Sequence, residues 1–111
     1  MNVYDTANQL AEEIKQSEEY VTYNMAKEAI NLNFELKNKI DEFEKTRYEA
    51  QISALQTGKD DEEKLRHVQE LYGKLIQNEE ASKYFDAEVK FNVMIADINK
   101  IIGEAVQGLL K

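Results

Sequence analysis

The segment YFDAEVKFNVMIADINKIIGEAVQGL, residues 84–109, decides the fold of this chain. Apolar residues recur in it at intervals of three, four or seven positions: Tyr84, Phe91, Ile95, Ile98, Ile102, Ala105 and Leu109. Only Glu88 interrupts this spacing. Side chains three or four positions apart share one face of an α-helix, so the segment predicts a long amphipathic helix. At 1.5 Å per residue, a helix from Glu79 to about residue 107 is roughly 40 Å long.

The same helical period runs through the rest of the chain, in sets that begin at Val3, Leu36, Ala50 and Leu65. The 111 residues contain no proline, where average usage would give about five, and proline breaks helices. Alternation typical of strands does not extend beyond four residues. We therefore predict an all-α fold, an elongated helical bundle of about four to five helices with a long C-terminal helix, in a single domain, 1–111.

Capping residues predict where the helices begin and end. Ser17 resembles an N-cap followed by acidic residues, which favours separate helices over 3–16 and 18–31, with one continuous helix as the alternative. Gly58 suits a left-handed helix stop, and Asp60 with Glu63 resembles a capping box. Interruptions at Asn31, Asn33 and Asn78 complete the pattern, which gives three further helices over about 34–56, 61–77 and 79–107.

Composition excludes several classes of function. The chain has 14 Lys and Arg against 22 Asp and Glu, a net charge of −8, whereas a nucleic-acid binder needs a cationic surface, so we expect no direct nucleic-acid binding. The absence of cysteine excludes disulfides, thiol catalysis and thiolate metal sites. The N-terminus lacks the basic and apolar regions of a signal peptide, and charged residues interrupt the apolar stretch 93–110, so we expect a cytoplasmic protein without a membrane span.

No residue pattern indicates catalysis or a bound metal or cofactor. His67 is the only imidazole, and Lys64 stands where a Glu-x-x-His metal motif would need an acid. The carboxylates fall on predicted solvent faces or first turns, and the serines have no plausible histidine partner for a triad. We therefore assign no catalytic, cofactor or metal residues. A metal- or ligand-binding bundle remains an alternative, with His67 as a ligand or with an aromatic stacking cluster formed by Tyr84, Phe85 and Phe91.

The length of the last helix predicts self-association. A compact domain of this size is about 34 Å across, so a monomer would not cover the whole apolar stripe, and a homodimer is the commonest solution. We predict a homodimer interface on one face of this helix, formed by Tyr84, Phe91, Ile95, Ile98 and Ile102. Arg47 also falls on an apolar stripe, where a structural ion pair is expected. A membrane-surface protein using this amphipathic helix is a further alternative, although its polar face has few basic residues.

Three stretches resemble the YlbF/YmcA family of small helical bacterial proteins, and its YheA-like branch in particular. They are YDTANQL at 4–10, SEEY at 17–20 and MIADINKII at 94–102. The resemblance covers nearly the whole chain and implies an all-helical fold, self-association and a bacterial cytoplasmic setting. It also implies a role with partner proteins in RNA processing, competence, sporulation or biofilm formation. Some family members are linked to an iron–sulfur cluster held by cysteines, which this chain lacks.

The expected function is therefore that of a non-enzymatic helical homodimer, a protein-interaction or regulatory adaptor. Its protein partners are not identified by the sequence. The small-ligand or metal-binding bundle and the membrane-surface protein remain the alternatives.

Overall fold

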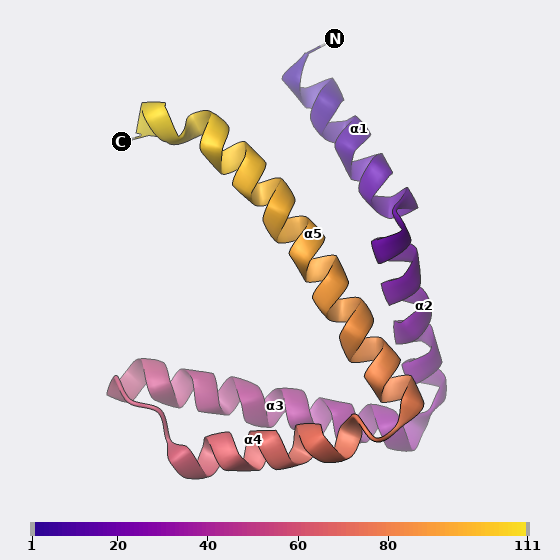
Figure 1. The fold of residues 1–111 in the computed structure, drawn as a ribbon, viewed down its shortest axis with the longest axis vertical. Helices are drawn as coiled ribbons and strands as arrows, with labels where there is room; N and C mark the ends of the chain where they lie inside the picture. The colour runs from indigo at the N-terminus through magenta and orange to yellow at the C-terminus, as the bar shows by residue number, and fades with distance from the viewer. Residues whose placement is uncertain (1, 111) are drawn as a thin grey trace. The chain divides into compact units, whose positions relative to one another are not determined.

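The computed structural model describes residues 2–110, and this part of the chain contains five α-helices and no strand (Figure 1). The helices are α1 (Val3–Gln16), α2 (Glu18–Leu32), α3 (Phe34–Thr57), α4 (Glu62–Leu75) and α5 (Glu79–Leu110). The predicted all-α fold with a long C-terminal helix is confirmed. None of these helices is long and apolar enough to cross a membrane.

Contacts divide the chain into two compact units. The terminal unit consists of the chain up to Lys27 and from Tyr84 onward, and the hairpin unit consists of Glu28–Lys83. The unit boundaries fall inside α2 and α5. That the whole chain forms a single domain stays a prediction.

Short polar side chains separate the helices as the sequence indicates. The Ser17 hydroxyl donates a hydrogen bond to the Ile14 carbonyl oxygen at 2.6 Å and accepts one from the Tyr20 amide at 3.1 Å, so it ends α1 and begins α2. Asn33 caps α3, and Gly58 ends it in the left-handed conformation, with φ of 75°. The predicted break at Ser17 and the predicted stop at Gly58 are both confirmed.

The start of α4 differs from the sequence prediction by one residue. Asp61, rather than Asp60, is the N-cap, because its Oδ1 atom accepts hydrogen bonds from the amides of Glu63 and Lys64 at 3.0 and 3.2 Å. This helix ends at Leu75, two residues before the predicted end. The last helix continues to Leu110, beyond the predicted end at about residue 107, because Gly108 does not adopt the left-handed conformation that would stop it.

In the hairpin unit, α3 and α4 lie side by side (Figure 1). The buried face of α3 carries Leu36, Ile40, Phe43 and Ala50, which follow the helical period read from the sequence. The ring of Phe43 lies 5.7 Å from that of Tyr72 on α4, centroid to centroid. Arg47, for which an ion pair was expected, places its guanidinium carbon 5.3 Å from the centroid of the Phe43 ring, a cation–π contact.

Candidate functional site

An aromatic cluster joins α2 to α5 in the terminal unit. The centroid of the Tyr23 ring lies 5.8 Å from that of Tyr84 and 5.4 Å from that of Phe91. The rings of Tyr20 and Phe91 meet edge-on, with their centroids 6.2 Å apart. The ring centroids of Tyr84 and Phe85 are 5.3 Å apart. Two residues of the predicted dimer interface, Tyr84 and Phe91, are therefore engaged within the chain. Of the three rings predicted as a stacking cluster, Tyr84 contacts Phe85, and Tyr23 of α2 lies between Tyr84 and Phe91. That these rings stack on a ligand stays a prediction.

Glu88 has a structural role on the face of α5 where it interrupts the apolar spacing. Its Oε2 atom accepts a hydrogen bond from the Tyr23 hydroxyl at 3.2 Å, across 65 positions of sequence. A carboxylate on an otherwise apolar stripe is the sequence signal for such a partner. The sequence does not identify that partner, because Tyr23 is one of six tyrosines and lies on a different helix.

The apolar stripe of α5 becomes more exposed along the helix. Tyr84 is 6% exposed and the side chains of Ile95 and Ile98 are half-buried, whereas Ile102 is 52% exposed. Leu109, further along the same face, is 87% exposed. We call the part formed by Ile95, Ile98, Ile102, Val106 and Leu109 the α5 apolar face. The helix thus presents an apolar surface over its last turns.

Helix α1 presents a second apolar surface in the same unit. Val3, Ala7, Leu10 and Ile14 share one side of this helix and are called the α1 apolar face. No residue of α1 is buried, and Val3 is 80% exposed, although Leu10 and Ile14 are half-buried. Figure 1 shows α1 and the last turns of α5 diverging toward the chain termini. Large apolar surfaces of this kind mark interaction sites.

The polar residues singled out from the sequence do not converge. His67 is exposed on α4. Within residues 2–110, no three His, Asp or Glu side chains are grouped closely enough to hold a metal ion. That the protein carries no metal or cofactor stays a prediction. The exposed apolar faces of α1 and α5 are suited to binding another apolar surface.

Comparison with known proteins places the chain in a family. A family model described as "Control of competence regulator ComK, YlbF/YmcA" matches residues 3–107. A UPF0342 protein of Desulfitobacterium hafniense is 36% identical over 110 residues, which cover 99% of this chain and 89% of the relative. UPF0342 proteins of Symbiobacterium thermophilum and Staphylococcus aureus are 35% and 34% identical, over 94% and 92% of this chain and 93% and 90% of their own lengths. These names describe competence control or a protein family, and none of them names an enzyme. The chain belongs to the YlbF/YmcA family.

Proposed function

We propose that this protein is a non-enzymatic homodimer that acts as a regulatory adaptor, and that the α5 and α1 apolar faces form the dimer interface. The observation that carries this proposal is the exposure of the α5 apolar face, where Ile102 and Leu109 are 52% and 87% exposed. Tyr84 and Phe91 support the interface from within the chain, because they hold α5 against α2. Ile95, Ile98 and Ile102 remain in the proposed interface.

The apolar surface on the two faces is on the scale of the apolar part of a dimer interface. Eight large side chains lie on the two faces: Val3, Leu10, Ile14, Ile95, Ile98, Ile102, Val106 and Leu109. Full burial of a large apolar side chain is worth roughly 1.5–3 kcal/mol, and each Å² of buried apolar surface is worth about 25 cal/mol. A fully exposed side chain therefore contributes roughly 60–120 Å² of apolar surface. Because Leu10, Ile14, Ile95 and Ile98 are already half-buried, the two faces offer at most about 500 Å² of apolar surface per chain. A standard interface of about 800 Å² per partner is a little more than half apolar, so this area is on the scale of its apolar part. A second copy supplies a matching apolar surface without a further component.

The regulatory part of the proposal rests on the family. Its description concerns control of a competence regulator, and the resemblance implies effects on RNA processing or development. With a net charge of −8, the protein is poorly suited to direct contact with RNA or DNA. We therefore propose that any such effect passes through protein partners, and that the protein works in the cytoplasm.

Two adjacent isoleucines provide a matched test of the dimer. Ile102 lies on the α5 apolar face, whereas Ile101 is 68% exposed and lies about 100° away around the helix. We expect Ile102→Asp to shift the protein to monomer in sedimentation velocity and Ile101→Asp to leave the dimer intact, with both variants helical by circular dichroism. Equal behaviour of the two variants would contradict the proposed interface.

The adaptor role has a separate test. Chemical crosslinking in a native bacterial host, followed by capture of the wild-type protein and the Ile102→Asp variant, identifies partners that depend on the dimer. We expect specific protein partners that the wild type retains and the variant loses. Catalytic turnover of a small molecule by the purified protein would contradict the non-enzymatic assignment.

A further inference from the structure

A groove runs between α2 and α5 in the terminal unit, next to the α5 apolar face. It encloses about 550 Å³ and is lined on one side by Glu18, Glu19 and Thr22 of α2. The other side belongs to α5: Ala87, Val89, Lys90, Val93, Met94, Asp97 and Ile98. From Ala87 to Ile98 the groove follows eleven residue steps of α5, roughly 16 Å. That length corresponds to about three turns of an accompanying helix.

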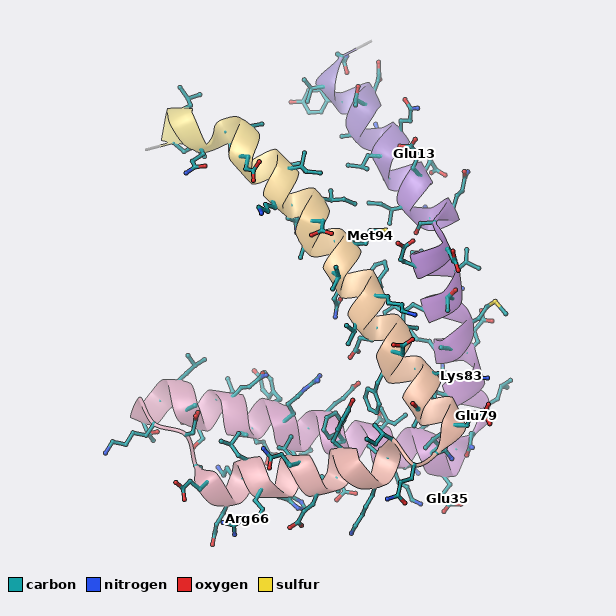
Figure 2. The ribbon with its side chains drawn as sticks, viewed as in Figure 1. Glu13, Glu35, Arg66, Glu79, Lys83 and Met94 are labelled. Carbon is teal, nitrogen blue, oxygen red and sulfur yellow. The ribbon has the colours of Figure 1, made fainter. Side chains whose placement is uncertain are left out.

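The floor of the groove is apolar and adaptable. Val93 is 54% exposed, while Met94 and Ile98 are half-buried. Figure 2 shows Met94 on the side of α5 that faces the junction of α1 and α2. A methionine has an unbranched, flexible side chain that adjusts to different apolar partners. Amphipathic helices bind apolar grooves of this kind through side chains spaced three, four and seven residues apart.

The rim of the groove is acidic. Glu18, Glu19 and Asp97 place three carboxylates along it. Lys90 is the one basic residue of the lining, and its ammonium group already lies 3.0 Å from the Asp86 carboxylate. Glu18 and Glu19 lie in the first turn of α2, where the helix dipole stabilises negative charge. Asp97 lies in the middle of α5, so the helix dipole does not account for its position. The rim therefore favours a cationic partner.

We propose that this groove docks an amphipathic helix of a partner protein, with apolar side chains on the Met94 floor and Lys or Arg side chains beside Glu18, Glu19 and Asp97. The inference rests on the proposed adaptor function and specifies the chemistry of the partner. Helix α1 of a second copy is a poor occupant, because Asp5, Glu12 and Glu13 give it a net negative charge against this rim. The dimer and the docked helix use adjacent faces of α5, with Ile98 at their common edge.

The probe is a synthetic helical peptide of about 15 residues, with leucines spaced three and four apart and flanked by lysines. A second peptide is identical except that glutamates replace the lysines. Fluorescence anisotropy of the labelled peptides is measured against the full chain. We expect the lysine peptide to bind and the glutamate peptide to bind at least roughly tenfold more weakly, since like charges in the rim oppose each other. Equal binding of the two peptides, or no binding of either, would overturn the proposal.

Matched variants locate the bound peptide. Asp97→Lys reverses a charge in the groove, and Glu70→Lys makes the same charge change on an exposed part of α4 outside it. We expect Asp97→Lys to weaken binding of the lysine peptide roughly tenfold and Glu70→Lys to change it less than about twofold. Val93→Asn, which makes the floor polar without adding charge, is compared with Val21→Asn at a position on α2 outside the groove. Equal losses within either pair of variants would place the binding elsewhere.

A single introduced cysteine separates the other occupants. Because the chain contains no cysteine, Val93→Cys gives a unique thiol whose rate of alkylation reports access to the groove. We expect the lysine peptide to protect this thiol. Protection that rises with protein concentration alone would show a second copy in the groove and contradict the proposal. Light scattering in the same samples reports the dimer independently, so a peptide that binds a monomer would contradict only the proposed homodimer.

Discussion

The Tyr23 hydroxyl donates a hydrogen bond of 3.2 Å to the Glu88 carboxylate, and this bond gives a partner to the acidic residue that interrupts the apolar spacing of α5. The same tyrosine ring packs on Tyr84 and Phe91, and the ammonium group of Lys27 lies 4.9 Å above it. A single α2 side chain thus combines apolar packing with a polar contact to α5. These contacts hold α2 against the first half of α5, and the exposed apolar face lies on the second half of the same helix.

Removal of the Tyr23 hydroxyl tests this contact. We expect Tyr23→Phe to lower the free energy of unfolding by about 1 kcal/mol, since the ring packing stays and one half-buried hydrogen bond to a carboxylate is lost. Tyr48→Phe is the control, because Tyr48 is 64% exposed. Urea unfolding followed by circular dichroism measures both variants. The hydrogen bond does not contribute to stability if Tyr23→Phe is as stable as the control. It also does not contribute if Glu88→Ala lowers the free energy of unfolding as much in the Tyr23→Phe background as in the wild type.

Two glycines respond to the same substitution in opposite directions. Gly58 has φ of 75°, so Gly58→Ala forces a Cβ atom into the left-handed region and should destabilise the protein by about 1 kcal/mol. Gly103 lies inside α5, where an added Cβ atom would meet nothing within 4 Å, so Gly103→Ala should stabilise the protein by about 0.5–1 kcal/mol. Thermal unfolding measures both. A loss of stability in Gly103→Ala would show that another surface packs closely against this residue.

The position of the α4 cap is tested by two adjacent aspartates. We expect Asp61→Ala to cost about 1 kcal/mol, because two amide hydrogen bonds lose their acceptor. Asp60→Ala should change stability by less than about 0.5 kcal/mol, the usual range for a surface substitution. Urea unfolding measures both variants. A larger loss of stability in Asp60→Ala than in Asp61→Ala would show that Asp60 is the N-cap, as the sequence pattern predicts.

The charge distribution predicts the response to RNA. Residues 1–58 carry 11 acids and 6 bases, and residues 59–111 carry 11 acids and 8 bases, which leaves net charges of −5 and −3. Neither half provides a basic surface that would release counterions from a phosphate backbone. We expect no binding of single- or double-stranded RNA at submicromolar protein near physiological salt, as measured by filter binding. Tight binding that weakens with added salt would contradict this.

The sequence predicts the helices of this protein well, because local signals determine them. The residues Ser17, Asn33 and Gly58 act within one or two turns, and the boundaries they predict agree with the structure to within one residue. The predicted ends of α4 and α5 were wrong by two and about three residues. The Asp60 prediction was wrong by one residue, since adjacent aspartates are equivalent as a pattern and only the geometry of the first turn selects Asp61. Local signals therefore give the elements and leave their exact ends to the backbone.

The candidate surface was less predictable, because it depends on contacts between distant segments. Nothing near Tyr84 or Phe91 in the sequence shows that α2 supplies Tyr20 and Tyr23 to cover them. Periodicity places Tyr84 and Ile102 on one stripe, but only the fold shows that the first is buried and the second is half-exposed. The α2–α5 groove has the same origin, since Glu18 and Asp97 are almost eighty positions apart.

The molar mass of the wild-type protein in solution tests the central proposal most directly. Size-exclusion chromatography with multi-angle light scattering, at protein concentrations of about 1 to 100 μM, detects any dimer with a dissociation constant in the micromolar range or below. We predict twice the chain mass of 12.9 kDa, because a second copy covers the α5 and α1 apolar faces. A folded protein that stays at 12.9 kDa at the highest concentration would contradict the homodimer.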